Sequence, residues 1–334
     1  MRAAVHTTYG PAEVVSVQEV PAPTPLPHEL LVRVHATTVN RTDCGYRSGK
    51  PFVVRFFSGV PRPRARIWGN EFAGVVADVG SGVSKFVVGD RVFGYVEGRF
   101  GAHAELLTVA ETASVALIPA SVTFEQAAAG TEGSHYALSF LQRAGFRDGD
   151  TVLVNGATGA IGSALVQLAK ASGATVTAVT DTDHAALVEG LGADRVVDYL
   201  KVDFTLDEQR YDSVLDAVGK STFNRCRGLL KPGGVYLSSE LGPGWQNPPL
   251  ALVTPLLRAA PLLDGKTVVF PYPGHDQETI RQLAASMERG DFTPVIDRTY
   301  PLEQIVEAYR YVETGRKVGN VVITVLDAAE GHDG

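Results

Sequence analysis

The stretch TVLVNGATGAIGSALVQLAKASG, residues 151–173, decides the fold. An apolar run leads into a turn with Gly156, Gly159 and Gly162, and an alanine-rich amphipathic pattern follows. We interpret these parts as a buried strand, a glycine turn and a helix whose free N–H groups face the turn, which is a geometry that receives a pyrophosphate. Ala157 takes the first position of the usual G-x-G-x-x-G. A turn that only packs helix on strand is the alternative, but the strand before and the helix after favour dinucleotide binding.

Strand and helix patterns continue to alternate after this stretch. Fully apolar strands separated by amphipathic helices indicate a parallel sheet covered on both faces. Before it, residues 2–120 contain short β-rich runs broken by Pro and Gly, which indicate an all-β, barrel-like unit. The pattern changes near Ser121, where Thr123 and Gln126 predict a capping box at the start of a helix. We expect the last strand, residues 319–326, to rejoin the first unit.

Length and charge limit the classes of protein. A chain of 334 residues predicts two domains, or one large one. With 30 Lys and Arg against 37 Asp and Glu, the net charge is −7, so we expect neither nucleic acid nor a membrane as a partner. Two cysteines, Cys44 and Cys226, build neither a disulfide framework nor a zinc site alone, which suits a reducing cytoplasm. We see no signal peptide and no bilayer-spanning run.

The end of the second strand of this βαβ pattern bears on which nucleotide is bound. Asp181 lies about 20 residues beyond the last glycine, where a carboxylate holds a bare ribose. It would repel a 2′-phosphate, as would Asp183, whereas a protonated His184 would attract one. These residues can also simply cap the next helix. The choice between NADP(H) and NAD(H) therefore stays open.

The whole chain resembles the zinc-independent medium-chain dehydrogenase/reductases, in their quinone oxidoreductase and enoyl reductase branch. Seven blocks in the family's order carry the resemblance: VNRTDCGYRSG (39–49), GNEFAGVVADVGSGVSKFVVGDRVFG (69–94), VLVNGATGAIGSALVQLAK (152–170), LGADRVVDY (191–199), YDSVLDAVG (211–219), LKPGGVYLS (230–238) and TPVIDRTYPLEQIVEAYRYVETGRKVGNVVI (293–323).

This resemblance implies an α/β fold with two domains. A GroES-like β-rich catalytic domain, residues 1–122 and 296–334, would enclose a Rossmann NAD(P)-binding domain with a doubly wound parallel sheet, residues 123–295. The active site would lie in the cleft between them. The resemblance also implies cytoplasmic homodimers.

The same comparison bears on zinc. Zinc-dependent relatives place Cys where Asn40 stands and His where Asn70 stands, and they carry four thiolates in the region of residues 98–106. None of these ligands is present, so we expect no zinc. Without a Lewis acid, hydride delivery to an electron-poor C=C or a quinone is easier than oxidation of an unactivated alcohol.

Three residues are our candidates for the catalytic site. The Asn40 amide can donate to a substrate carbonyl or fix the nicotinamide carboxamide, although Asn also forms turns. Asp43 is expected to orient its neighbours, because a carboxyl donor at neutral pH needs a strongly raised pKa. Tyr46 is a possible proton donor or stacking ring, and equally a packing residue.

The family pattern also implies cofactor contacts. Relatives use a Thr at the position of Gly133 to contact the nicotinamide, and either Thr131 or Ser134 is a possible substitute. The full set of expected cofactor-binding residues is Thr131, Gly156, Ala157, Thr158, Gly159, Ala160, Ile161, Gly162, Thr180, Asp181, His184, Tyr199, Val218, Gly219, Ser239, Leu241, Phe270, Tyr272 and Arg316.

A basic, aromatic segment precedes residue 69. It contains Arg55, Arg62, Arg64 and Arg66 with several aromatic residues, in an otherwise acidic chain. One interpretation is an exposed loop with solvated or paired arginines. The other is a lid that attracts an anionic substrate.

The function predicted is a zinc-free NAD(P)H-dependent reductase of quinones or α,β-unsaturated carbonyl compounds. A metal-free biosynthetic alcohol dehydrogenase or reductase is the enzyme alternative. A dinucleotide-binding sensor or assembly protein without turnover is the alternative from a different class.

Overall fold

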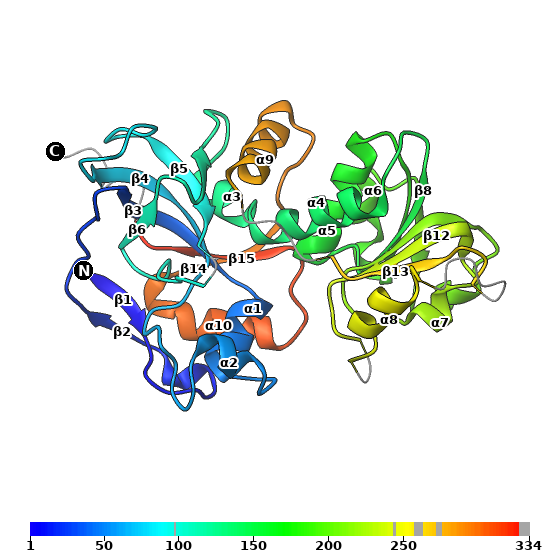
Figure 1. Cartoon of the computed structure of the whole chain (residues 1–334), viewed down its shortest axis with the longest axis horizontal. Helices are drawn as coiled ribbons and strands as arrows, with labels where there is room; N and C mark the ends of the chain where they lie inside the picture. The colour runs from blue at the N-terminus through cyan, green and yellow to red at the C-terminus, as the bar shows by residue number, and fades with distance from the viewer. Residues whose placement is uncertain (97, 243–244, 257–262, 272–275, 327–334) are drawn as a thin grey trace. The chain divides into compact units, whose positions relative to one another are not determined.

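The computed structural model describes residues 1–96, 98–242, 245–256, 263–271 and 276–326. The chain divides into two compact units. Unit 1 contains residues 1–132, 275–290 and 294–334, and unit 2 contains residues 133–274 and 291–293. Figure 1 shows both, coloured along the chain. Each unit is described by itself.

Unit 1 is built on a mainly antiparallel sheet. The sheet order is β14-β15-β3-β4-β5-β7, with β6 on β3, and β1 and β2 form a separate pair. Its strands are β1 (Arg2–Val5), β2 (Ser16–Glu19), β3 (Glu29–Val39), β4 (Glu71–Val79), β5 (Arg91–Tyr95), β6 (Leu106–Ala110), β7 (Ser114–Leu117), β14 (Ile296–Pro301) and β15 (Asn320–Thr324). β15 pairs antiparallel with β3, which confirms that the last strand rejoins the first unit.

Helices close this sheet around an apolar core. Val34 and Phe72 from the sheet and Ile305 and Tyr309 from α10 are buried in one cluster, so the amphipathic face of α10 stabilises the unit by burial of apolar area. The helices are α1 (Arg41–Ser48), α2 (Val54–Ser58), α3 (Phe124–Ala129), α9 (Gln277–Arg289) and α10 (Ile305–Glu313), with short 3₁₀ turns η1 (Ala12–Val14) and η5 (Leu302–Gln304).

Unit 2 is a parallel sheet. Its order is β10-β9-β8-β11-β12-β13, and these strands pair in parallel, so the chain runs outward from β8 in both directions. Among the described strands, that is the doubly wound Rossmann order, with its switch point between β8 and β11. The strands are β8 (Thr151–Asn155), β9 (Thr175–Thr180), β10 (Arg195–Asp198), β11 (Tyr211–Asp216), β12 (Leu230–Ser238) and β13 (Thr267–Val269).

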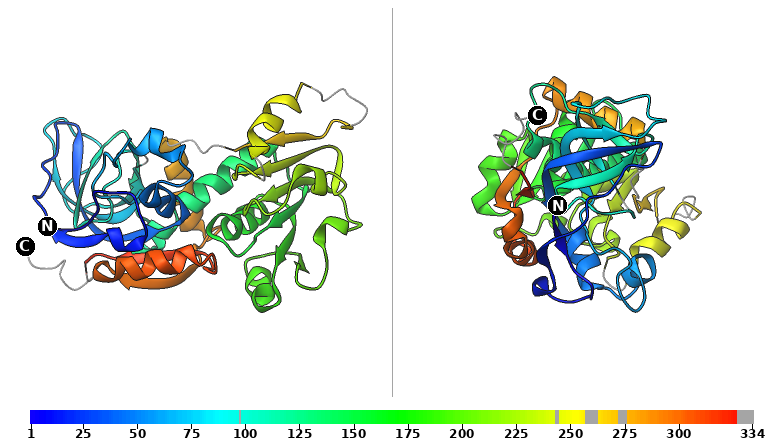
Figure 2. Two further views of the ribbon diagram at one scale, coloured as in Figure 1. Left: turned by 90° about the horizontal axis from the view of Figure 1, so that it is seen from below. Right: turned by 90° about the vertical axis from the view of Figure 1, so that its left-hand side faces the viewer.

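Helices flank both faces of this sheet, as Figures 1 and 2 show. They are α4 (Glu132–Ala144), α5 (Ala160–Ala171), α6 (Ala185–Gly190), α7 (Phe223–Cys226) and α8 (Asn247–Val253), with η2 (Thr182–His184) and η3 (Phe204–Leu206). Two-sided cover explains why Leu153 and Val214 are fully buried, and why the strands read as apolar runs. The predicted α/β fold is confirmed.

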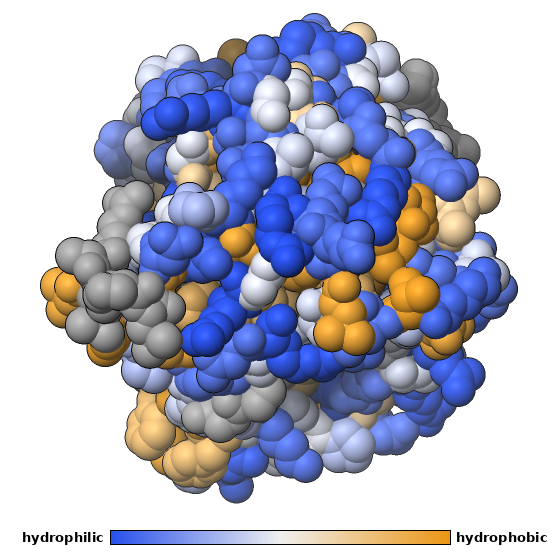
Figure 3. All heavy atoms as spheres, turned by 90° about the vertical axis from the view of Figure 1, so that its right-hand side faces the viewer, coloured by the Kyte–Doolittle hydropathy of each residue, from blue (hydrophilic) through white to orange (hydrophobic). Residues whose placement is uncertain are grey.

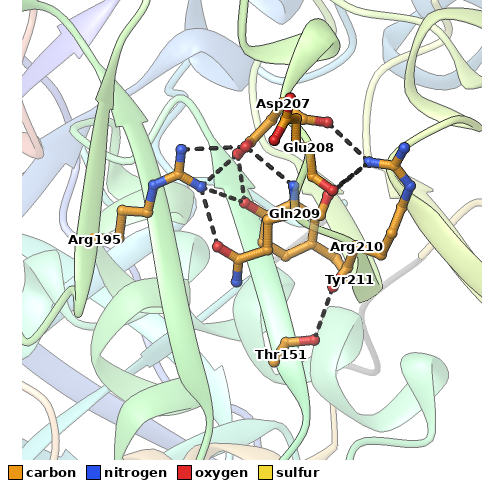
Figure 4. A network of polar contacts seen from close by, with 7 residues as sticks. All are labelled: Thr151, Arg195, Asp207, Glu208, Gln209, Arg210 and Tyr211. Atoms are coloured by element: carbon orange, nitrogen blue, oxygen red, sulfur yellow. Dashed lines mark hydrogen bonds and ion pairs between the residues drawn. The ribbon is translucent and has the colours of Figure 1, made fainter.

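A polar network closes the amino edge of the parallel sheet (Figure 4). Arg195, at the start of β10, donates to both carboxylate oxygens of Asp207, at 2.6 and 3.2 Å. The Tyr211 hydroxyl, at the start of β11, donates to the same carboxylate at 2.9 Å. This fork geometry fixes the loop before β11. In open α/β sheets, ligands bind at the opposite edge, outside the carboxyl ends of the strands.

The compact units differ from the predicted domain spans at two helices. Both α3 and α9 belong to unit 1, although the sequence analysis assigns residues 123–295 to the nucleotide-binding domain. The physical reason is packing, because α3 contacts β3 and β4 while α9 contacts β7. Thr123 and Gln126 form the predicted capping box at the start of α3.

Two surface properties complete the description. On the face in Figure 3 hydrophilic residues dominate, and hydrophobic residues lie in separate groups. Among the described residues, no helix is both long enough and apolar enough to cross a membrane.

Candidate functional site

The glycine turn of unit 2 precedes α5, and its three glycines differ in the room around them. Gly156 has φ +81°, and a Cβ there would lie 2.3 Å from Val218. A Cβ on Gly162 would lie 2.0 Å from the Gly156 carbonyl oxygen. Packing therefore requires both glycines. Gly159 is different, because its φ is an ordinary −70° and the nearest atom to a Cβ would be 3.7 Å away.

The amino end of α5 fits a phosphate. Gly159 is the N-cap and supplies no side-chain hydrogen bond, so no side chain caps the first turn. The N–H groups of Ala160, Ile161 and Gly162 have no partner four residues back within the helix. Together with the open position at Gly159, they form a cradle for an anionic group. The residues present therefore fit the pyrophosphate of a dinucleotide.

The parallel sheet brings most of the expected cofactor residues to one edge. Strands β8, β9, β10, β11, β12 and β13 all point the same way, so their carboxyl ends share that edge. The expected residues on the segments that follow these strands, or at the end of β9, are residues 156–162, Thr180, Asp181, His184, Tyr199, Val218, Gly219, Ser239, Leu241 and Phe270. Tyr272 lies outside the described residues, and Arg316 is exposed in unit 1.

Asp216 holds the turn at the switch point, and the sequence analysis missed it. It is fully buried at the end of β11. Its carboxylate accepts hydrogen bonds from the Asn155 amide at 3.0 Å, from Gly219 N–H at 3.0 Å and from the Tyr236 hydroxyl at 2.8 Å. It positions the segment with Val218 and Gly219. An aspartate ending an apolar strand is the signal that could have found it.

Asp181 and His184 are paired with each other. Asp181 Oδ1 lies 2.5 Å from His184 Nδ1 and accepts the His184 backbone N–H at 3.1 Å, so it caps η2. Both side chains remain partly exposed. The capping alternative is thus observed, and it uses one oxygen of the Asp181 carboxylate. Thr180, buried at the end of β9, has a hydroxyl without a partner among the described residues.

Gly133 is required by close packing inside unit 2. A Cβ there would lie 2.8 Å from the carbonyl carbon and oxygen of Ala160. The Thr that relatives are expected to carry at this position would therefore collide with the first turn of α5. The Thr131 hydroxyl is not free to take over the nicotinamide contact expected of that Thr. Its side chain is fully buried and its hydroxyl lies within hydrogen-bonding distance of the Glu71 carboxylate and the Ala128 carbonyl.

Unit 1 contains a buried polar cluster centred on Glu71. This carboxylate is 1% exposed, and four donors surround it: the hydroxyls of Thr38 and Thr131, the backbone N–H of Glu132 at 2.6 Å and the amide of Asn40 at 3.1 Å. Such a set of donors lets a carboxylate stay buried. Glu71 and Glu132 are functional candidates that sequence reasoning missed. Their signal is an acidic residue at the start of an apolar strand, Glu71, or at the start of a helix, Glu132.

Asn40 connects the members of this cluster. Its Nδ2 donates both to Glu71 and to Glu132, while its Oδ1 accepts the Asp43 N–H at 3.1 Å. Asp43 Oδ2 in turn accepts the Asn40 N–H at 2.9 Å, which completes a capping box for α1. Both hydrogens of the Asn40 amide are therefore committed to carboxylates. The expected donation from Asn40 to a substrate carbonyl would need one of them to be released.

Burial perturbs the acids of the cluster. It raises the pKa of Asp43 to about 8, helped by the charge of Glu71 and opposed by the hydrogen bond from Asn40 N–H. Burial, then the charges of Glu71 and Asp43, raise the pKa of Glu132 well above its ordinary value. Burial lowers the pKa of Lys317, although Glu132 and Glu71 oppose this shift. The raised pKa that the sequence analysis required of a carboxyl donor is therefore present at Asp43, which also orients the backbone of Asn40.

Comparisons with known proteins agree with this geometry. Residues 26–120 match the family model for the alcohol dehydrogenase GroES-like domain, and residues 191–323 match the model for zinc-binding dehydrogenase. The 2-methylene-furan-3-one reductase of Solanum lycopersicum is 32% identical over 97% of this chain and 79% of its own length. This chain belongs to the medium-chain dehydrogenase/reductase family. Within it, the similarity is to the quinone and enoyl reductase branch.

Two further relatives of this medium-chain dehydrogenase/reductase support the assignment. The quinone oxidoreductase of Sus scrofa is 29% identical over 95% of each chain. The solved structure of the quinone oxidoreductase from Coxiella burnetii has a TM-score of 0.83 and 25% identity, and the match covers 98% of this chain and 99% of that one.

The family name implies zinc, and the residues of unit 1 do not fit it. Within the described residues no group of three or more His, Cys, Asp and Glu is placed to hold a metal ion. The Asn40 N–H groups point at the oxygens of Glu71 and Glu132 that a cation would need. Amide side chains at positions 40 and 70 also lack the thiolate and imidazole donors that zinc prefers.

Asn70 is buried without a partner. It is 1% exposed, and neither its Oδ1 nor its Nδ2 has a hydrogen-bond partner among the described residues. An unsatisfied buried amide is costly and calls for an explanation. The sequence analysis used Asn70 only as evidence about zinc.

Tyr46 belongs to an aromatic cluster of this medium-chain dehydrogenase/reductase. Its half-buried ring stacks on Trp68, with centroids 5.4 Å apart and planes 10° apart. Phe100 meets it edge-on at 5.0 Å. These contacts favour the packing alternative for the ring.

Proposed function

We propose that this chain is a zinc-free, NAD(P)H-dependent oxidoreductase that reduces quinones or α,β-unsaturated carbonyl compounds. One observation carries the proposal: the open position at Gly159, facing the uncapped N-terminus of α5, fits a dinucleotide pyrophosphate. The bound reduced nicotinamide would supply a hydride. The names of the relatives, a furanone reductase and a quinone oxidoreductase, support this substrate class.

The chain's own residues have to polarise the substrate, because the cluster in unit 1 does not suit a metal. Asn40 has both amide hydrogens committed to carboxylates, so its role is to hold Glu71 and Glu132 in place. Asn70, one residue before Glu71, has an unused amide donor. We assign to Asn70 the hydrogen bond that draws electron density to the substrate oxygen. Asp43 and Glu132, whose pKa values are raised, can keep a proton near neutral pH.

The choice of nucleotide depends on Asp181 and His184. The Asp181 carboxylate disfavours a 2′-phosphate and favours NADH, while a protonated His184 in contact with it would favour NADPH. We propose that the pair accepts both nucleotides. The proposal also retains a cytoplasmic location and a homodimer.

Turnover with both nucleotides tests this function. The purified chain should consume NADPH or NADH with a panel of quinones and enones, with added chelator making no difference. Tight nucleotide binding with no consumption would instead identify the sensor alternative. Consumption with alcohols and oxidised nucleotide alone would identify the metal-free alcohol dehydrogenase alternative.

A further inference from the structure

A cationic segment without acids lies in unit 1. Between Asp43 and Glu71 the chain has no Asp or Glu, while it has six Lys and Arg residues. This concentration occurs in a protein whose net charge is −7. We call residues 50–66, which include α2, the basic–aromatic lobe. The negative net charge of the chain does not cancel this local positive charge, because salt screens exposed charges beyond about 10 Å, the Debye length.

The basic–aromatic lobe exposes large apolar side chains. Phe52 is 59% exposed, Phe56 62%, Phe57 74% and Val60 57%. Phe52 and Phe56 pack edge-to-face, with ring centroids 5.6 Å apart, so they form one apolar knob. Large apolar side chains that are exposed next to one another mark an interaction surface.

The base of the lobe is anchored. Arg55 lies over the ring of Tyr9 at 4.6 Å, and the Tyr9 hydroxyl donates to the Gly59 carbonyl at 2.7 Å. Arg64 N–H bonds to the Ser58 carbonyl at 2.8 Å. The fold therefore holds these phenylalanines outward instead of burying them.

The cations of the lobe are unpaired. Lys50, Arg62, Arg64 and Arg66 are exposed, and within the described part of the chain none of them forms an ion pair. These side chains are therefore solvated and not paired with the acidic surface. Unpaired arginines beside exposed phenylalanines combine the two interactions that hold a protein at an anionic bilayer surface.

We propose that the basic–aromatic lobe docks this protein on an anionic lipid surface. Arginines would contact the lipid phosphates and carboxylates, and the phenylalanines would enter the interface. A small soluble substrate needs a concave site, whereas these side chains are outward and more than half exposed. A second copy is disfavoured, since a symmetric contact would bring two sets of cations together. This revises the expectation that no membrane is a partner, and it does not depend on the proposed function.

Cosedimentation of the full chain with vesicles tests the proposal without any turnover. Vesicles of phosphatidylcholine alone are compared with vesicles of equal parts phosphatidylcholine and phosphatidylserine, at low and at high salt. We expect binding only to the anionic vesicles, weakened by salt. R62Q/R64Q/R66Q should lower the partition coefficient roughly 100-fold, about fivefold per arginine, and F56Q/F57Q should lower it as well.

A matched control removes the same charge elsewhere. Arg143, Arg147 and Arg227 are exposed residues of unit 2, so R143Q/R147Q/R227Q should leave vesicle binding within about twofold of the parent chain. The proposal is overturned if the parent ignores anionic vesicles or if this control loses as much binding as the lobe variant. It is also overturned if the lobe variants change only the oligomeric state, or only the KM for a soluble anionic enone.

Discussion

The amide nitrogen of Asn40 lies 3.1 Å from Oε2 of Glu71 and also donates to the carboxylate of Glu132. Asn40→Asp would remove both donors and add a fourth carboxylate to those of Glu71, Glu132 and Asp43. We expect a loss of about 3 kcal/mol in the free energy of unfolding, measured by urea titration. Asn224 is exposed on α7, so Asn224→Asp is the control and should change stability by less than about 0.5 kcal/mol. Equal stability of Asn40→Asp and the parent would contradict the bridging role.

In contrast to Asn40, a change at Asn70 should affect activity more than stability. Because its amide is buried without a partner, Asn70→Ala removes an unsatisfied group and should keep stability within about 1 kcal/mol. If Asn70 polarises the substrate, kcat/KM falls about 10- to 100-fold, mainly through kcat. Steady-state kinetics and a thermal melt on the same sample check this. Unchanged kinetics would remove Asn70 from the site.

Two glycines of the turn separate nucleotide binding from folding. Gly159→Ala places a Cβ 3.7 Å from its nearest neighbour, without a clash and at an ordinary φ, so the apoprotein should fold normally while the Kd for NADPH rises at least about tenfold. Gly162→Ala places a Cβ 2.0 Å from the Gly156 carbonyl oxygen and should destabilise the apoprotein itself. Fluorescence titration and melting temperatures distinguish the two effects. An unchanged Kd in Gly159→Ala would argue against a phosphate at this position.

The stability of the protein should fall with rising pH through the titration of Asp43. In the unfolded chain this carboxyl loses its proton near its ordinary pKa of 3.8, whereas burial raises its pKa to about 8 in the fold. Between these values the folded state binds more protons, so the Asp43 contribution is complete below about pH 4 and is lost by pH 8. Asp43→Asn should flatten this part of the stability profile. Asp183→Asn, an exposed control, should leave it unchanged.

Local patterns were enough to predict the strands and the glycine turn of unit 2 and the start of α3 in unit 1. The apolar strands, the glycine turn and the capping residue Thr123 each act over a few neighbouring positions, so one sequence contains the information. The assignment of α3 and α9 to unit 1 was not predictable in the same way. Each of these helices is placed by its contacts with strands remote from it in the sequence, as α3 is with β3 and β4.

The candidate site likewise has one part that local sequence patterns predict and one part that depends on contacts remote in sequence. The residues of unit 2 that are expected to bind the cofactor follow strand ends, and the parallel sheet gathers them on one edge. The cluster of Asn40, Glu71 and Glu132 joins positions up to 92 residues apart, so no spacing in the sequence reveals it. Gly133 has a similar explanation, since only its approach to Ala160 shows why a larger residue is excluded.

The most direct test of the account follows the hydride itself. The chelator-treated enzyme is given an α,β-unsaturated ketone and nicotinamide cofactor carrying deuterium at the transferable C4 position, and the product is read by NMR. The account predicts deuterium at the carbon β to the carbonyl and a solvent-exchangeable proton source for the α carbon. Deuterium on the carbonyl carbon, giving an allylic alcohol, or no transfer after metal removal would contradict it.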